Sequence, residues 1–263
     1  MISKIFTNSL KRGISFKPVN KINTFNYNSL RRMSNSVSNF YDKKNLTYGH
    51  GIPSEIVFGR NETTMKQIPS ILNGEKCAVL GYGPQGQGQA LNLRDSGVEV
   101  CIGVRENGSS WKKAIEDGFI PGETLFPIEE AVEKGNIIMF LLSDAGQIDI
   151  YPQIRDKLDN KNKTLYFSHG FGVVYQDKTN IDVDNLKNTD VIMVAPKGSG
   201  KSVRTLYQNG GGINASYAVH RDDSGNAENK ALAIGFGIGS PYIYETTFLK
   251  EVSSDLTGER SVL

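Results

Sequence analysis

A short apolar run that breaks into a glycine-rich turn constrains the fold of this chain more than any other feature. Residues 76–90 read KCAVLGYGPQGQGQA, and the turn matches the pattern GxGxxG. Gly81 permits a sharp exit from a strand, Gly83 lets the backbone approach a pyrophosphate, and Gly86 lets the next helix pack near the strand. Free amides at the helix start then face the anion. The segment predicts a strand–turn–helix unit that holds a dinucleotide, with a tight turn without ligand as the alternative.

The chain beyond this unit continues to alternate between strand-like and helix-like segments. Short apolar runs are typical of buried parallel strands, and the segments between them are compatible with helices. The runs are 76–81, 98–104, 137–142, 164–168 and 190–195, and the helical segments include 86–96, 109–118, 127–134 and 146–158. This alternation predicts an α/β fold with a doubly wound, Rossmann-type parallel sheet.

Ligands of such sheets bind beyond the carboxyl ends of the strands. The loops that follow the predicted strands should therefore share one rim of the sheet. They are the segments 81–86, 105–110, 143–147, 168–172 and 196–200.

The distribution of charge separates a leader from the body of the chain. Residues 1–41 hold seven of the 30 Lys and Arg residues and no acid, so 23 basic residues remain against 28 acidic ones. A basic, acid-free, Ser/Asn-rich N-terminus is typical of mitochondrial transit peptides. We expect residues 1–44 to direct the protein to the mitochondrial matrix, with a disordered basic tail as the alternative. The acidic body predicts no nucleic-acid partner, and no apolar run is long enough to predict a membrane span.

Two cysteines, Cys77 and Cys101, lie in separate apolar runs without CxxC spacing. This spacing is typical of buried, reduced thiols and favours neither a disulfide nor a zinc site. We assign them no chemical role.

The end of the second predicted strand bears on the choice of cofactor. Folds that bind NAD usually place an acidic residue there to accept from the ribose hydroxyls. This chain has Arg105, followed by Ser109 and Ser110. A cation with two hydroxyl donors suits the additional phosphate of NADP, although Glu106 is adjacent. The segment favours NADP over NAD, with a solvated loop charge as the alternative for Arg105.

Two further strand ends carry candidates for chemistry. His169 follows one apolar run in SHGF, and Lys197 follows another in APKGSG. A histidine in this place is either a hydrogen-bonded structural residue or a catalytic one. An ammonium group at the same rim could fix a substrate carboxylate or hold acidic metal ligands in place.

The segment SSDLTGER places Asp255 and Glu259 four residues apart. On a helix these carboxylates share one face, and hard oxygen ligands at that separation can hold Mg²⁺. The alternative is a solvated acidic helix face, on which Arg260 neutralises one carboxylate.

Seven motifs in this order resemble ketol-acid reductoisomerase, most closely the fungal mitochondrial form, over about residues 46–263. They are GYGPQGQGQALNLRDSG, GVRENGSSW, LLSDAGQ, TLYFSHGF, VIMVAPKGSG, GGINASYAVH and VSSDLTGER. The resemblance implies that Arg105 and Ser110 contact the 2′-phosphate of NADPH. It also implies that His169 is catalytic, that Lys197 supports a cluster of metal and substrate, and that Asp255 and Glu259 bind Mg²⁺. The remaining implied cofactor residues are Tyr82, Gly83, Pro84 and Gln85 at the pyrophosphate turn, with Ala145, Gly146, Gln147 and Gly200.

The family's reaction starts from an acetohydroxy acid such as 2-acetolactate. An alkyl group migrates to the neighbouring carbonyl carbon, and NADPH then reduces the resulting ketone to give a 2,3-dihydroxy acid. The resemblance therefore implies an Mg²⁺-dependent, NADPH-dependent enzyme of branched-chain amino acid biosynthesis. Another NADP-dependent dehydrogenase that works without Mg²⁺ and a non-catalytic NADPH-binding module are the alternatives.

Family members continue past DLTGER into a helical domain that supplies further metal ligands and a substrate-binding serine. We therefore expect residues 45–244 to form the NADP-binding Rossmann domain and residues 245–263 to begin the second, all-α domain. This chain by itself is expected to bind NADPH without turning over substrate. With the complete helical domain, a homo-oligomer is expected.

Overall fold

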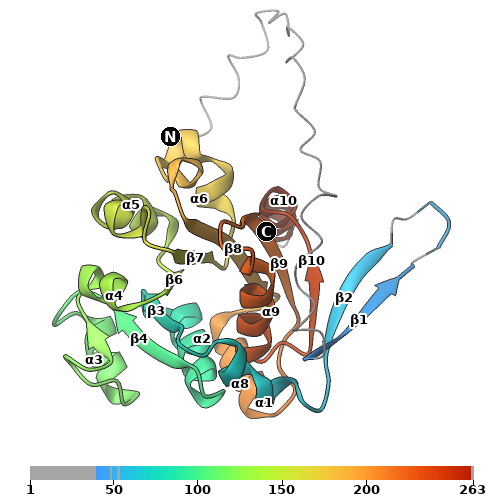
Figure 1. Cartoon of the computed structure of the whole chain (residues 1–263), viewed down its shortest axis with the longest axis horizontal. Helices are drawn as coiled ribbons and strands as arrows, with labels where there is room; N and C mark the ends of the chain where they lie inside the picture. Colours follow the sequence, from blue (N-terminus) through green and yellow to red (C-terminus); the bar gives the residue numbers. More distant parts are fainter. Residues whose placement is uncertain (1–39, 48, 52–53, 262–263) are drawn as a thin grey trace, which may run out of the picture. The chain divides into compact units, whose positions relative to one another are not determined.

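One ten-stranded sheet runs through the computed structural model, which describes residues 40–47, 49–51 and 54–261. For residues 259–261 only the backbone is described. The strand order is β1-β2-β10-β9-β8-β7-β6-β3-β4-β5 (Figure 1). The strands are β1 (Tyr41–Leu46), β2 (Glu55–Arg60), β3 (Lys76–Leu80), β4 (Glu99–Gly103), β5 (Leu125–Phe126), β6 (Ile137–Phe140), β7 (Lys163–Phe167), β8 (Thr189–Pro196), β9 (Ala215–Arg221) and β10 (Tyr242–Glu245).

Six neighbouring strands of the sheet, namely β5, β4, β3, β6, β7 and β8, are parallel to one another. Their spatial order, β5-β4-β3-β6-β7-β8, is the classic Rossmann order, in which the direction of winding reverses between β3 and β6. All five strands predicted from the sequence are present. The predicted α/β class and doubly wound sheet are confirmed.

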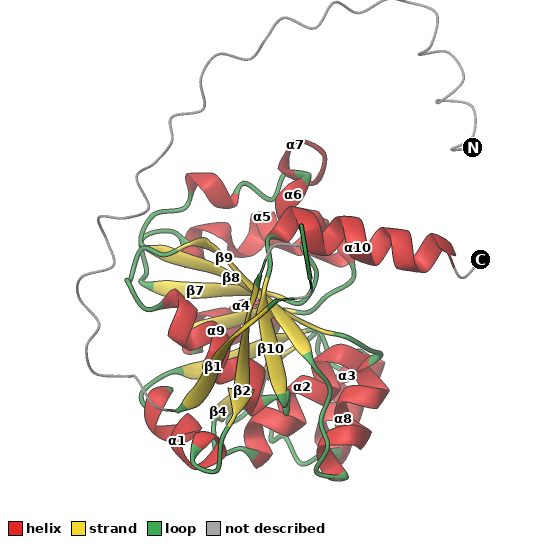
Figure 2. Cartoon of the chain, turned by 90° about the vertical axis from the view of Figure 1, so that its right-hand side faces the viewer, coloured by secondary structure: helices red, strands yellow, loops and turns green. Residues whose placement is uncertain are grey.

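The helices lie on both sides of the strands (Figure 2). They begin close to the predicted positions wherever the sequence showed an apolar run followed by a helical segment. Their bounds are α1 (Thr64–Ile71), α2 (Pro84–Asp95), α3 (Ser109–Glu116), α4 (Ile128–Lys134), α5 (Asp144–Leu158), α6 (Phe171–Val174), α7 (Gln176–Thr179), η1 (Val183–Asn185), α8 (Gly200–Gln208), α9 (Ala227–Gly237) and α10 (Phe248–Ser261). None of these described helices is both long and apolar enough to cross a lipid bilayer.

Each face of the sheet carries its own apolar core. Cys77 and Val79 belong to one cluster and Ala78 and Leu80 to the other, because successive strand residues point to opposite faces. Cys101 pairs in register with Ala78 and therefore lies on the face opposite Cys77. Both thiols are buried and free, and burial raises the pKa of Cys101 to about 11. The predicted absence of a disulfide between them is confirmed.

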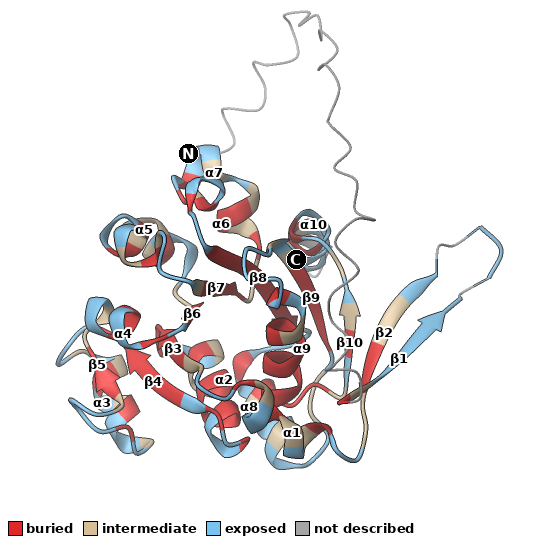
Figure 3. Ribbon diagram, in the orientation of Figure 1, coloured by how far each residue is buried: buried red, intermediate tan, exposed pale blue. Residues whose placement is uncertain are grey.

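Four strands that the sequence did not predict extend the sheet beyond β8. β9 runs antiparallel to β8, β10 pairs with β9 in parallel, and the hairpin of β1 and β2 adds two antiparallel strands. β1 (YDKKNL) is exposed along most of its length (Figure 3). It lacks the apolar pattern from which a strand is predicted, since no second layer covers it.

The segments next to the two predicted domain boundaries pack on the body of the sheet. Most of the predicted leader, residues 1–44, lies outside the described residues, but β1 already begins at Tyr41 and Phe40 is only 1% exposed. At the other end, α10 packs on the sheet through Phe248 and Val252, which are 5% and 1% exposed. Both segments belong to the same compact unit, Asn39–Leu263. The boundaries at 44 and 245 stay predictions, and in the structure apolar contacts join the described ends of the chain to the core.

Candidate functional site

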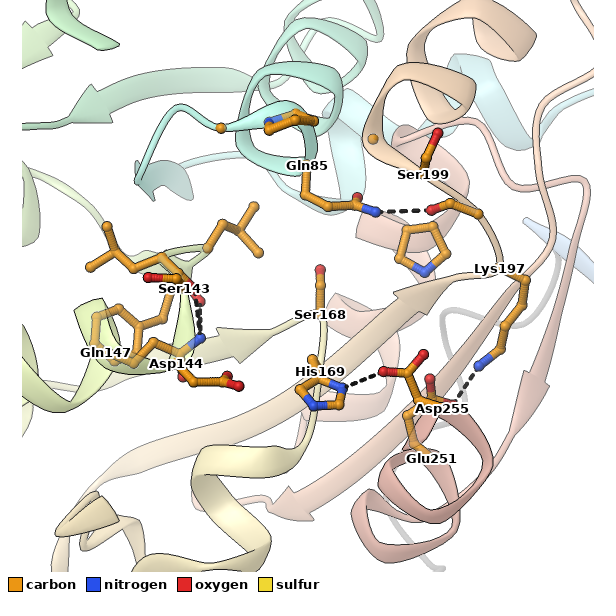
Figure 4. A pocket seen from close by; sticks show the side chains of 18 of the residues that line it. Gln85, Ser143, Asp144, Gln147, Ser168, His169, Lys197, Ser199, Glu251 and Asp255 are labelled. Atoms are coloured by element: carbon orange, nitrogen blue, oxygen red, sulfur yellow. Dashed lines mark hydrogen bonds and ion pairs between the residues drawn. The ribbon is translucent and has the colours of Figure 1, made fainter. Parts of the chain in front are cut away.

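A cleft of about 840 Å³ opens at the carboxyl ends of β3, β6, β7 and β8 (Figure 4). Its volume lies in the range of small-molecule and cofactor sites. Four of the five predicted rim loops contribute to it, and α10 closes the far wall. It is lined by Gly83, Pro84, Gln85, Phe140, Leu141, Leu142, Ser143, Asp144, Gln147, Ser168, His169, Pro196, Lys197, Gly198, Ser199, Gly200, Glu251, Ser254, Asp255 and Gly258.

The three glycines of the GxGxxG turn have three different surroundings. Gly81 has φ +95°, in the region that favours glycine, and a Cβ at Gly86 would lie 2.1 Å from the carbonyl oxygen of Gly81. A Cβ at Gly83 would meet nothing within 4 Å. Gly81 and Gly86 thus make the turn and the close helix packing possible, while Gly83 leaves open space at the cleft. The surroundings of Gly81 and Gly86 agree with the predicted turn and helix packing, and the approach of a pyrophosphate at Gly83 stays a prediction.

Three helix N-termini point into this cleft. α2 begins after Gly83, α5 after Ser143 and α8 after Ser199, and the hydroxyls of the two serines accept from the amides of Gly146 and Ser202, both at 3.3 Å. α2 and α8 approach so closely that a Cβ on Gly200 would lie 2.1 Å from the carbonyl carbon of Pro84. Unpaired amides and helix dipoles at these ends favour an anion such as a pyrophosphate.

The predicted 2′-phosphate residues lie apart from the cleft lining, at the carboxyl end of β4. Arg105 is exposed, and Ser109 and Ser110 open α3. Within the described part of the chain, no side chain forms a hydrogen bond or ion pair with the Arg105 guanidinium. Its five donors are therefore free for an external acceptor.

The opposite wall of the cleft carries two pairs of basic and acidic side chains. His169 Nδ1 lies 3.1 Å from Asp255 Oδ2, and Lys197 Nζ forms an ion pair with Glu251 Oε2 (Figure 4). The histidine and the lysine come from the ends of β7 and β8, and both carboxylates come from α10. The structure thus brings His169 and Lys197, at the strand ends, into contact with the acidic segment of α10. The sequence identified these two groups of residues independently.

Sequence reasoning missed Glu251. Its side chain is 8% exposed and also accepts from the Ser216 hydroxyl at 2.9 Å. Glu251, Asp255 and Glu259 recur at intervals of four, and this spacing was the available signal, because such residues share a helix face. Glu259 continues α10, but its side chain is outside the described residues.

This wall of the cleft offers few protein ligands for Mg²⁺. Among the side chains that are described, no three His, Cys, Asp or Glu residues gather closely enough to hold a metal ion. The Asp255 carboxylate borders the cleft and is 45% exposed. A hard, accessible carboxylate fits Mg²⁺, which proteins usually bind through one or two carboxylates together with water and substrate oxygens.

The other predicted cofactor residues differ in how they are placed relative to the cleft. Tyr82 belongs to the turn through its backbone only, because its ring is buried and its hydroxyl donates to Asp117 Oδ2 at 2.9 Å. Gln147 is 5% exposed and donates to the carbonyls of Phe140 and Leu142 at 3.2 and 3.1 Å, so it supports the loop after β6. Ala145 and Gly146 lie in the first turn of α5 but do not line the cleft, whereas the adjacent Ser143 and Asp144 do.

Comparison with known proteins identifies the same region of the chain. Residues 71–242 match the family model described as acetohydroxy acid isomeroreductase, NADPH-binding domain. The chain is 55% identical over 217 residues to a protein of Desulfosudis oleivorans named ketol-acid reductoisomerase (NAD(+)), covering 82% of this chain and 61% of that protein. It is 53% identical to the probable mitochondrial ketol-acid reductoisomerase of Schizosaccharomyces pombe, covering 80% of this chain and 51% of that protein. The chain therefore spans about half to three-fifths of the length of these curated relatives.

Solved structures agree with this result. The NADH-preferring ketol-acid reductoisomerase of an uncultured archaeon superposes with a TM-score of 0.67 at 41% identity, covering 74% of this chain and 58% of that one. A semialdehyde dehydrogenase NAD-binding protein of Cupriavidus necator, at 16% identity and a TM-score of 0.52, shares the fold alone. With the family's cofactor domain matched over residues 71–242 and the cleft built from its motifs, this chain belongs to the ketol-acid reductoisomerase family.

Proposed function

We propose that this chain supplies the cofactor site and one wall of the substrate site of a ketol-acid reductoisomerase. The reaction is the Mg²⁺-dependent alkyl migration and NADPH reduction of 2-acetolactate or 2-aceto-2-hydroxybutyrate to a 2,3-dihydroxy acid, in the biosynthesis of valine, isoleucine and leucine. One observation carries this proposal: the cleft sets three helix N-termini opposite the pairs His169–Asp255 and Lys197–Glu251. An anionic cofactor and an oxygen-rich substrate can then lie side by side.

Cofactor choice follows from Arg105. The relative from Desulfosudis is named for NAD(+) and the archaeal enzyme is NADH-preferring, so both cofactors occur among proteins similar to this chain. Here the Arg105 guanidinium is exposed and has no partner among the described residues, and Ser109 and Ser110 follow it at the start of α3. A 2′-phosphate would accept charge-assisted hydrogen bonds from this set, which supports NADPH.

The remaining residues act on the substrate side. Lys197 presents an ammonium group that can bind the substrate carboxylate, and Glu251 keeps that group in position. His169 is placed to hold a proton or orient water at Nε2, because its Nδ1 faces Asp255. Asp255 and Glu259, one helical turn apart, would hold Mg²⁺, which as a Lewis acid stabilises the negative charge that builds on substrate oxygens.

The first test measures cofactor binding by the chain itself, with NADPH fluorescence or calorimetry as the readout. Saturable binding at one site is expected, with NADH bound more weakly. If neither cofactor binds, the proposed function is wrong.

Activity is tested after supplying the helical region of a longer relative, as oxidation of NADPH that depends on acetolactate. Turnover should require Mg²⁺ and should stop when a chelator is added. Turnover that persists in the chelator would instead favour an Mg²⁺-independent dehydrogenase. Cofactor binding without any acetolactate consumption would favour a non-catalytic binding module.

The cellular location proposed for this protein is the mitochondrial matrix. Relatives from Schizosaccharomyces pombe and Saccharomyces cerevisiae are named mitochondrial. The basic, acid-free segment 1–41 supports the same location for this chain.

A further inference from the structure

A fully buried amide lies directly beneath the cleft. Gln89 is on α2, one turn after Gln85, and its side chain is 0% exposed. Burial of an amide lowers stability unless its polar atoms form hydrogen bonds. The partners of Gln89 therefore indicate which segments its side chain holds together.

Every donor of the Gln89 amide is used. Its Nε2 donates to Gln85 Oε1 at 3.1 Å and to Ser168 Oγ at 2.9 Å. Its Oε1 accepts from the Tyr166 hydroxyl at 2.8 Å. Removal of this amide therefore breaks three hydrogen bonds, to Gln85, Ser168 and Tyr166.

The network continues to three strand ends of the cleft. The Tyr166 hydroxyl also lies 3.0 Å from the carbonyl oxygen of Val194 on β8 and accepts from Ser168 Oγ at 3.1 Å. Gln85 Nε2 donates to the carbonyl oxygen of Gly198 at 2.9 Å. Gln85, Ser168 and Gly198 all line the cleft, and Ser168 precedes His169. Hydrogen bonds that start at Gln89 therefore connect the loops after β3, β7 and β8 on the side away from the cleft lining.

Tyr166 anchors this network through its buried hydroxyl. Burial raises the pKa of its hydroxyl well above the usual range, so it stays protonated and donates. Because the ring is 0% exposed on a central strand, the hydroxyl gives Gln89 a fixed point of attachment.

We infer that Gln89 is a positioning residue for the cofactor: through Gln85 and Ser168 it holds the pyrophosphate turn and the His169 loop at the spacing that the bound cofactor requires. This inference rests on the proposed function, because it takes NADPH as the occupant of the cleft. Gln89 itself does not line the cleft, so it acts only through residues that do.

The test compares Gln89→Met with Asn92→Leu. Asn92 is also on α2, is 0% exposed and has all its amide atoms bonded, but its partners Val203, Ile238 and Arg204 lie outside the cleft lining. Both variants lose a buried amide, so both should lose thermal stability. Only Gln89→Met should raise the Kd for NADPH, by roughly fivefold to tenfold, as expected for the loss of one or two buried hydrogen bonds.

Tyr166→Phe provides a second, milder variant, because it removes one oxygen and adds no volume. It should raise the Kd for NADPH in the same direction, and the double variant should bind no more weakly than Gln89→Met, since both changes break one network. If Gln89→Met does not fold, Tyr166→Phe measured against Asn92→Leu decides the matter.

Two outcomes would overturn the inference in different ways. If wild-type chain binds NADPH and the Gln89 and Tyr166 variants bind it as the Asn92 variant does, Gln89 has a structural role only and the proposed function stands. If the wild-type chain does not bind NADPH, both are wrong.

Discussion

The two described carboxylates that α10 presents to the cleft differ in how firmly they are bound by protein partners. Glu251 is nearly buried and accepts from both Lys197 and Ser216. Asp255 is 45% exposed and faces His169 alone among the side-chain partners that are described. Asp255 can therefore exchange partners when a ligand enters, whereas Glu251 keeps the lysine in place.

The proposed preference for NADPH depends on single residues and can be tested at Arg105. Arg105→Gln should raise the Kd for NADPH roughly tenfold or more, because a charge-assisted hydrogen bond to the 2′-phosphate is lost. The Kd for NADH should change by less than about twofold, and the unfolding free energy should stay unchanged, because the side chain is exposed and unpaired. Titration with both cofactors checks this, with Lys112→Gln as the control on an exposed lysine of α3. Equal losses for the two cofactors would contradict the assignment.

Asp190 predicts the response of the fold to acid. Burial alone would raise the pKa of this carboxyl, but hydrogen bonds from Ser224 and the ammonium of Lys230 outweigh burial and lower it. The unfolded chain therefore binds the proton more tightly, and this contribution to stability is present above about pH 4 and lost as the pH falls through the lower folded pKa.

Asp190→Asn should lower the unfolding free energy by about 2 kcal/mol at pH 7, because the buried ammonium of Lys230 loses its nearer carboxylate and keeps only Glu75, at 3.5 Å. Between pH 5 and pH 2, taken as roughly the window of carboxyl titration, its stability should fall less steeply than that of the wild type. Chemical unfolding at a series of pH values measures both effects. Asp156→Asn, at a carboxyl that is 96% exposed, is the control, and parallel pH profiles for Asp190→Asn and wild type would refute the prediction.

At the scale of elements, the turn between β3 and α2 performs two separable tasks. Gly86 lets the helix pack against the strand, and Gly83 keeps the cleft open. A methyl group at one position should therefore disturb folding and at the other should disturb ligand binding.

Gly86→Ala should lower the unfolding free energy by about 2 kcal/mol or more, because its Cβ would overlap the backbone oxygen of Gly81. Gly83→Ala should stay within about 1 kcal/mol of wild type, since its φ of −73° suits alanine, yet should weaken NADPH binding roughly tenfold. Thermal unfolding and cofactor titration of the two variants check this pair. A stable Gly86→Ala protein with normal affinity would contradict the packing argument.

α10 is the element that completes the cleft. Phe248 and Val252 fix it on the body, while Leu249 on another side of the helix is 60% exposed. The carboxylates of Glu251 and Asp255 face the strand ends because they share the helix with these buried anchors. The wall of the cleft that α10 forms thus depends on the packing of Phe248 and Val252, which do not line the cleft themselves.

At the scale of the whole molecule, the Rossmann strands form one continuous sheet with β9, β10 and the β1–β2 hairpin. This extension begins at Tyr41, so the body of the fold reaches almost to the basic leader. We predict that the basic segment 1–40 carries the targeting signal.

Residues 1–40 fused to a fluorescent protein should enter mitochondria when expressed in yeast. The reporter should resist added protease until the inner membrane is opened, as expected for the matrix. Replacement of the seven Lys and Arg residues of this segment by Gln should leave the reporter in the cytosol, because import of such leaders depends on their positive charge. A cytosolic signal from the unaltered leader would refute the prediction.

The central strands, the glycine turn and the family could all be predicted from the sequence, because each depends on local patterns. An apolar run such as 137–142 needs only its own composition to be recognised as a buried strand, and GxGxxG needs only its spacing. The strands β1, β2, β9 and β10 could not be predicted in this way, since their pairing partners, not their own periodicity, make them strands.

The sequence by itself determined which residue types are available for chemistry, and the tertiary structure alone decided which of them meet. His169 and Asp255 are far apart along the chain, as are Lys197 and Glu251, and only the packing of α10 against the sheet brings each pair together. The same holds for Gln89, whose proposed role depends on partners in β7 and in the loop that follows it. Residue identity and local propensity can be read from the sequence, whereas contacts between distant segments depend on how the buried surfaces fit in three dimensions.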